Sequence, residues 1–305
     1  MYIGKEKISI TDNLEFFARQ VVEGFLTGFH KSPYHGFSVE FAEHRLYNPG
    51  DSMRNIDWKL YARSNKFFVK KFEEETNLRC HLLLDTSSSM LYKHGDIPSK
   101  LDFSVYSAAS LMYLFRKQRD GFGLTYFTNK LNFFTDAKST KSHYYRLLGE
   151  LDNILQLSSL KDKRTTDFPS IITDFVEKIH RRSLVIIFSD MQNFSQSYTK
   201  NLFDAMQYLR YKKNEVILFH VYHNETEKMF NFSNRPSTFY DLESDDRINL
   251  NPVNYKSEYL KLFNEFQAQL EMKCHQYQID YVQSPIEAGF NKILLAYLNK
   301  RSKLF

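Results

Sequence analysis

The sequence contains only two cysteines in 305 residues. Cys80 lies beside an expected buried strand and Cys274 lies in an expected helix, so the pair has neither the number nor the spacing of a disulfide framework or a metal site. We expect both to be reduced thiols in the core. Stability and metal binding, where present, must therefore come from other side chains.

Long hydrophobic runs are also absent. The longest apolar stretches, residues 111–115 and 184–188, fall far short of the roughly 20 residues that a membrane-spanning helix needs. Lys5, Glu6 and Lys7 are followed by no apolar segment, so we expect no signal peptide and no transmembrane segment. We predict a cytoplasmic protein.

Two nucleotide-binding motifs are missing as well, since the chain has neither a Gly-x-Gly-x-x-Gly fingerprint nor a phosphate loop, and it shows no internal repeat. The net charge of +5 comes from 41 basic and 36 acidic residues that are dispersed along the chain. This balance leaves nucleic-acid binding open, through basic residues near 66–71 and 180–182, without indicating it.

What is present is the composition and rhythm of an α/β protein. The chain is 42% hydrophobic, which suffices for a sizeable core. Short apolar strands alternate with amphipathic helices from residue 79 onward, which predicts a doubly wound, mostly parallel sheet flanked by helices. We place a helix and strand cap region at 1–78 and the α/β domain at 79–305.

The expected helices and strands follow this alternation. We predict helices at 12–27, 100–118, 142–156, 168–180, 196–211, 255–274 and 286–299, strands at 39–45, 67–72, 82–84, 121–127, 183–190, 215–222 and 277–282, an antiparallel edge strand at 131–134 and a hairpin-like excursion within 229–252.

One polar stretch follows the first apolar strand of the α/β region. Asp85, Ser87 and Ser89 form an Asp-x-Ser-x-Ser pattern at the carboxyl end of that strand, where open parallel sheets place their ligand sites. Carboxylate and hydroxyl oxygens are hard donors, which suits Mg²⁺ or Mn²⁺ better than zinc. The same pattern also occurs in ordinary turns and helix caps, so its context decides between the two.

Two distant residues supply that context. Thr166 precedes an expected helix, and Asp190 ends the strongest buried strand. Because a divalent ion of this kind takes about six oxygen ligands, these two residues would extend the set begun by the Asp-x-Ser-x-Ser pattern. Thr165 is the alternative to Thr166. We predict a metal site made of Asp85, Ser87, Ser89, Thr166 and Asp190.

A second unusual segment, residues 47–63, combines a Pro-Gly turn with the chain's only tryptophan. Arg54 and Asp57 are spaced to pair on a helical turn, and Arg63 has the guanidinium to bind a carboxylate in a bidentate way. One interpretation is a salt-bridged cap over the core. The other is a partner-binding surface that includes Arg54, Asp57, Trp58 and Arg63.

The five candidate ligands resemble the metal-ion-dependent adhesion site of von Willebrand factor A domains. The resemblance implies that the hydroxyls coordinate the ion directly or through water, that the aspartates act mostly through water, and that a partner's carboxylate completes the shell. It also implies a von Willebrand factor A-like fold. In such a site, weak ligation by the protein leaves the ion open to an outside carboxylate.

The segment at 45–63 narrows the resemblance to the bacterial domain-of-unknown-function family fifty-eight. The motif consists of Arg45, Tyr47, Pro49, Gly50, Asp51, Arg54, Ile56, Asp57, Trp58, Ala62 and Arg63. Members of that family commonly accompany MoxR-type AAA+ ATPases, so the resemblance implies an adaptor or co-chaperone that links the ATPase to client proteins or to metal insertion.

These features favour a non-enzymatic, Mg²⁺-dependent protein-binding module. A metal-dependent hydrolase is an alternative, since Mg²⁺ beside Asp and Ser would activate water. Against it, the serines serve as ligands rather than nucleophiles, and two-metal sites use more carboxylates. A nucleic-acid-binding protein is the third hypothesis, and salt-dependent retention on DNA would distinguish it.

Overall fold

The computed structural model describes residues 10–29, 44–47, 58–64, 66–70, 78–157, 163–191, 196–244 and 246–304. The chain divides into two compact units, one formed by residues 1–25 with 78–305 and the other by residues 26–77. The larger unit holds the main sheet and the helices that flank it. The domain boundary placed between residues 78 and 79 stays a prediction.

A six-stranded sheet forms the centre of the larger unit, with strand order β10-β7-β6-β3-β4-β5. Its strands are parallel except β5, which pairs antiparallel with β4. This confirms the predicted mostly parallel α/β sheet and its antiparallel edge, and the arrangement is Rossmann-like. The strands are β3 (Arg79–Asp85), β4 (Gly121–Phe127), β5 (Leu131–Phe134), β6 (Leu184–Ser189), β7 (Glu215–Tyr222) and β10 (Asp280–Pro285).

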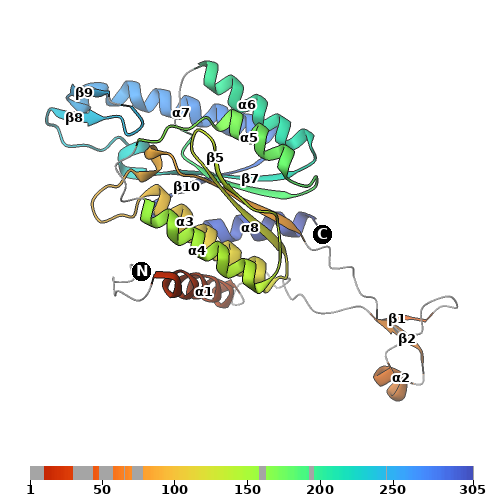
Figure 1. Cartoon of the computed structure of the whole chain (residues 1–305). Helices are drawn as coiled ribbons and strands as arrows, with labels where there is room; N and C mark the ends of the chain where they lie inside the picture. The colour runs from red at the N-terminus through yellow and green to blue at the C-terminus, as the bar shows by residue number, and fades with distance from the viewer. Residues whose placement is uncertain are drawn as a thin grey trace. The chain divides into compact units, whose positions relative to one another are not determined.

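Helices cover both faces of this sheet (Figure 1). One face carries α3 (Lys100–Lys117), α4 (Lys141–Leu157) and α8 (Asn291–Leu304), and the other carries α5 (Phe168–Lys178), α6 (Gln196–Tyr211) and α7 (Pro252–Gln276). The N-terminal helix α1 (Ile10–Phe29) packs on α3, where the rings of Phe17 and Tyr106 are 4.6 Å apart. Both faces are covered, which explains why the strands are continuous apolar runs.

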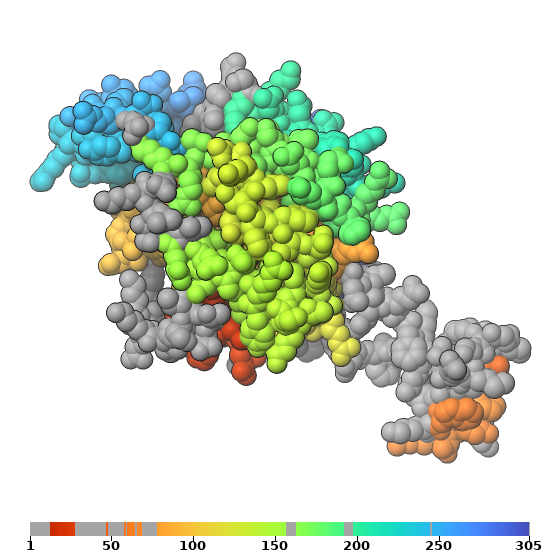
Figure 2. Space-filling view, in the orientation of Figure 1, coloured from red at the N-terminus to blue at the C-terminus, as the bar shows by residue number. Residues whose placement is uncertain are grey.

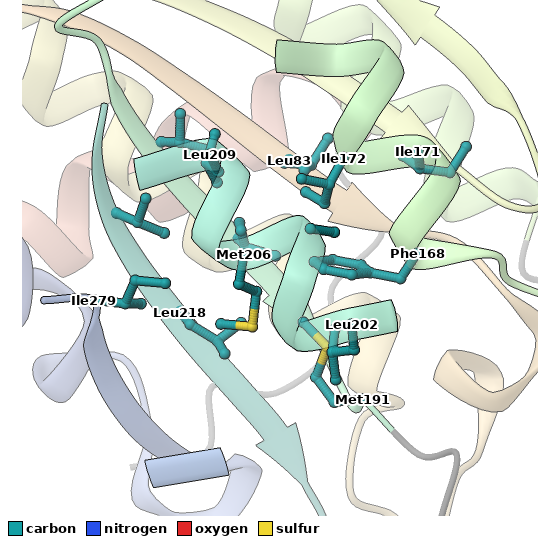
Figure 3. Close-up of a cluster of buried hydrophobic side chains, with 14 of the residues drawn as sticks. Leu83, Phe168, Ile171, Ile172, Met191, Leu202, Met206, Leu209, Leu218 and Ile279 are labelled. Carbon is teal, nitrogen blue, oxygen red and sulfur yellow. The ribbon is translucent and has the colours of Figure 1, made fainter. Parts of the chain in front are cut away.

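The core beneath α5 and α6 anchors two loops of the candidate site. Leu83 of β3 and Leu218 of β7 line the sheet side of this cluster, and Leu202 of α6 belongs to its helix side (Figure 3). Phe168 and Met191, which follow the loops containing Thr166 and Asp190, belong to the same cluster. Burying these two side chains holds both loops at the end of the sheet where β3 and β6 finish.

Outside the sheet, β8 (Ser237–Tyr240) and β9 (Arg247–Leu250) pair as an antiparallel hairpin, as predicted for 229–252. Short helical turns occur at η2 (Ser88–Leu91), η3 (Asn224–Lys228) and η4 (Ile286–Ala288). In the smaller unit, β1 (His44–Leu46) pairs with β2 (Phe68–Lys70), and α2 (Trp58–Ser64) lies between them in sequence. Residues 39–43 of the predicted first strand lie outside the described residues.

Both cysteines are free and buried, as expected. Among the helices that the structure describes, none is long and apolar enough to cross a membrane. The cytoplasmic location stays a prediction.

Candidate metal centre

The predicted ligands gather where the strand order of the sheet reverses. β3 pairs with β4 on one side and with β6 on the other, so the carboxyl ends of β3 and β6 form the switch point at which doubly wound sheets bind ligands. Asp85 is the last residue of β3, and Asp190 directly follows β6. The fold thereby brings together two carboxylates that are far apart in the sequence.

Asp85 is fully buried, and protein donors contact both of its carboxylate oxygens. The Ser87 amide donates to Oδ1 at 2.9 Å, and the Ser189 hydroxyl donates to Oδ2 at 2.7 Å. Burial, followed by the nearby negative charge of Asp190, raises the pKa of Asp85 to about 7. Two carboxylates that repel each other in a desolvated site favour a bound cation.

Three hydroxyls lie beside these carboxylates. The Ser87 and Ser89 hydroxyl oxygens are 3.0 Å apart at the start of η2. The loop with Thr166 is held against them, because the Ser88 amide donates to the Arg164 carbonyl at 2.8 Å and the Arg164 amide donates to the Ser88 hydroxyl at 2.8 Å. The Thr166 hydroxyl oxygen is buried and has no hydrogen-bond partner among the described residues.

Asp190 is held by a sharp backbone turn and a buried ion pair. The next residue, Met191, has φ of 51°, a backbone conformation that residues other than glycine rarely adopt. Its side chain is buried in the core. The Lys100 ammonium donates to Asp190 Oδ2 at 2.6 Å and to Glu227 Oε1 at 2.6 Å. Burial alone would lower the pKa of Lys100, but Asp190 and Glu227 raise it above its ordinary value.

Sequence reasoning missed Lys100 and Glu227. Lys100 is the first residue of α3, directly after the N-cap Ser99, where a lysine is normally exposed; here it is buried. Glu227 lies on η3 and also accepts the His223 amide at 2.7 Å. Neither residue belongs to a local motif, so only the folded chain reveals them.

Sequence reasoning also missed Glu243, at the tip of the β8–β9 hairpin. Its carboxylate accepts hydrogen bonds from the Ser89 hydroxyl and from the backbone amides of Ser89 and Thr166. Burial, and in smaller part the charge of Asp190, raise the pKa of Glu243. One carboxylate therefore bridges two of the predicted ligands, Ser89 and Thr166.

The donor set fits a hard divalent cation. Asp85 and Asp190 end the two strands, Glu243 contacts Ser89 and Thr166, and the Lys100 ammonium is shared between Asp190 and Glu227. The unpaired Thr166 hydroxyl adds an oxygen ligand that only a cation or an added donor would satisfy. The described residues contain no cluster of three His, Cys, Asp or Glu side chains placed to hold a metal, so the hydroxyls are essential to the fit.

The structure describes two of the four residues predicted for partner binding, Trp58 and Arg63. Trp58 and Arg63 lie on α2 in the smaller unit, and the Trp58 side chain is 59% exposed. The rings of Tyr61 and Phe67 stack beside it at 4.4 Å. Arg54 and Asp57 lie outside the described residues, so the choice between cap and contact surface stays open.

The family model described as "Protein of unknown function DUF58" matches residues 43–259, about seven tenths of the chain. Uncharacterized protein Rv1480 of Mycobacterium tuberculosis and Uncharacterized protein Mb1516 of Mycobacterium bovis are each 33% identical over 101 residues. Each match covers 33% of this chain and 32% of the relative. The chain thus spans about a third of the length of the curated relatives it matches.

Two solved structures are similar. BatB from Bacteroides thetaiotaomicron has 16% identity and a TM-score of 0.41, covering 74% of this chain and 99% of that one. An aerotolerance-related membrane protein from Bacteroides fragilis has 15% identity and a TM-score of 0.45, covering 73% and 97%. Both TM-scores lie below 0.5, and neither likeness bears on what this chain does.

Proposed function

We propose that this chain, which belongs to the DUF58 family, is a non-enzymatic protein-binding module whose contact point is a divalent cation at the ends of β3 and β6. Asp85, Ser87, Ser89, Thr166 and Asp190 would hold Mg²⁺ or Mn²⁺. When bound, the ion supplies an electrophilic position for an acidic side chain of a partner. In this proposal the fold is von Willebrand factor A-like.

The observation that carries the proposal is the buried Thr166 hydroxyl, which has no hydrogen-bond partner among the residues that the structure describes, beside the carboxylates of Asp85 and Asp190. A buried polar oxygen left unpaired costs about 1–3 kcal/mol. A hard cation would satisfy this oxygen and also offset the repulsion between Asp85 and Asp190. The chain's own residues prepare the site by fixing Asp85 through Ser189 and Asp190 through Lys100.

The proposed partner is a MoxR-type AAA+ ATPase together with its client proteins. Support for this comes from the resemblance to the family that commonly accompanies such ATPases. The proposed cation would take a carboxylate as its outside ligand. Asp and Glu side chains on a protein partner would supply that carboxylate.

Partner capture with and without Mg²⁺ tests the function, using wild type, Thr166→Val and the matched control Thr165→Val. Thr165 is exposed, whereas the Thr166 hydroxyl oxygen is buried and unpaired within the described part of the chain. We expect Thr166→Val to weaken Mg²⁺-dependent capture about tenfold or more, because one ligand is lost, and Thr165→Val to behave like wild type. Equal capture by all three proteins, or capture that ignores Mg²⁺, would overturn the proposal.

A further inference from the structure

Hydrogen bonds connect the described residues at the tip of the β8–β9 hairpin. The Asp241 amide donates to the Asp246 carbonyl at 3.0 Å, which closes the turn, and the Glu243 amide donates to Asp241 Oδ1 at 2.7 Å. The Asp246 amide donates to the Ser244 hydroxyl at 3.1 Å. These bonds hold the backbone on both sides of Glu243, and hydrogen bonds from Ser89 and Thr166 then position its carboxylate.

This tip is docked on the loops of the candidate metal centre. The Lys163 ammonium donates to the Ser244 carbonyl, and Lys163 also attracts the Asp241 carboxylate. The Glu243 carboxylate accepts hydrogen bonds from the Ser89 hydroxyl and from the backbone amides of Ser89 and Thr166. Figure 1 places the hairpin at the end of the sheet where β3 finishes, and Figure 2 shows the hairpin (light blue) on the surface.

The placement of Glu243 carries an electrostatic cost. A glutamate at a hairpin tip ordinarily keeps its charge in water. Here the carboxylate is half-buried and lies in the field of Asp190, a like charge. The amide donors offset part of this cost, and a cation in the centre would offset the rest.

Glu243 also occupies the donors that an outside carboxylate would use. Ser89 and Thr166 contribute both the hydroxyls of the candidate centre and the amides that bind Glu243. A partner's acidic side chain that approaches a cation held by these residues must therefore enter the position of Glu243.

From this arrangement we infer that Glu243 is a built-in ligand of the candidate metal centre, which the hairpin tip presents and which a partner's acidic side chain must displace. The inference rests on the proposed function for the identity of the incoming ligand. The hairpin then lowers the apparent affinity of the centre for an outside carboxylate, because that carboxylate must compete with Glu243.

Hydrogen exchange of the metal-free protein tests the docking itself. Glu243→Ala removes the acceptor of the Ser89 and Thr166 amides, so exchange in peptides spanning 88–91 and 164–166 should accelerate about tenfold. Glu258→Ala, which removes an exposed carboxylate on α7, is the matched control and should exchange like wild type. Unchanged exchange in Glu243→Ala would overturn the inference.

Acetate in the presence of Mn²⁺ tests the competition. Paramagnetic relaxation of the acetate methyl protons by protein-bound Mn²⁺ should rise several-fold in Glu243→Ala over wild type and Glu258→Ala. Equal relaxation in three proteins that all bind Mn²⁺ would contradict the inference about Glu243. It would still be consistent with the proposed metal centre. If none of them binds Mn²⁺, the proposed function fails, and the exchange comparison alone decides whether Glu243 covers the centre.

Discussion

At the scale of single residues, His81 makes the stability of the core depend on pH. It lies on β3 with 2% of its surface exposed, and neither ring nitrogen has a hydrogen-bond partner among the described residues. The rings of Phe134 and Phe175 pack around it. Burial lowers the pKa of His81 from 6.5 to about 4, although Asp136 opposes the shift. The folded protein therefore holds this imidazole neutral.

We predict an acid-dependent loss of stability from this residue. Between pH 6.5 and about 4 the unfolded chain binds more protons at His81 than the folded chain does, so the free energy of unfolding falls as the pH falls. The contribution is full above pH 6.5 and amounts to about 3 kcal/mol.

Urea unfolding across this pH window measures the effect. His81→Leu should flatten the slope, whereas His94→Leu, a change of an exposed histidine, should leave it unchanged. A wild-type slope in His81→Leu would show that another group controls the acid sensitivity.

Among the site residues, those in a local pattern could be predicted and those placed by tertiary contacts could not. Asp85, Ser87 and Ser89 stand within five positions of one another, so their pattern is visible in the sequence. Lys100 and Glu243 reach the centre only because α3 starts beside it and the β8–β9 hairpin folds onto it. Their neighbours in sequence give no sign of this role.

At the scale of elements, Gly123 on β4 shows how closely the residue that follows the edge strand β5 approaches β4. A Cβ atom at this position would lie 2.4 Å from the Thr135 carbonyl oxygen, which is backbone and cannot rotate away. Hydrogen bonds to Leu124 fix Thr135 to β4. The Thr135 amide and hydroxyl donate to the Leu124 carbonyl at 3.1 and 3.3 Å, and the Leu124 amide donates to the Thr135 hydroxyl at 3.0 Å. Only glycine permits this pairing.

Gly123→Ala should therefore destabilise the protein by about 1–3 kcal/mol, because β5 must shift. Gly149 provides the matched control, since it lies inside α4 and a methyl group added there would meet no atom within 4 Å. Gly149→Ala should stabilise the protein by up to about 1 kcal/mol. Denaturant midpoints measure both changes, and equal effects of the two substitutions would refute the steric argument.

Helix and strand prediction succeeded where periodicity was strong and slipped at the ends of elements. β4 and α6 have the predicted bounds. The last strand was placed at 277–282 but runs from Asp280 to Pro285, because α7 continues to Gln276 and Gln278 then turns the chain with φ of 58°. The closing helix is interrupted at Gly289, where φ is 72°. Such turns depend on one residue, and periodicity does not detect them.

At the scale of the whole molecule, the larger unit places a cluster of charged and polar side chains at the switch point of a largely apolar sheet. The ends of β3 and β6 and the start of α3 meet at this point. The core under α5 and α6 anchors the loops that contain Thr166 and Asp190. Burying several like charges there lowers stability unless a cation is bound. Metal binding should therefore be coupled to the stability of the folded chain.

The Mg²⁺ dependence of the melting temperature tests the central claim most directly, with wild type and Asp85→Asn compared at constant ionic strength. A cation bound only by the folded chain adds about 2.7 kcal/mol at a concentration 100 times its Kd. We predict that the melting temperature of wild type rises steadily with Mg²⁺ and that Asp85→Asn responds little. No rise up to millimolar Mg²⁺, or the same rise in both proteins, would contradict a metal centre at the ends of β3 and β6.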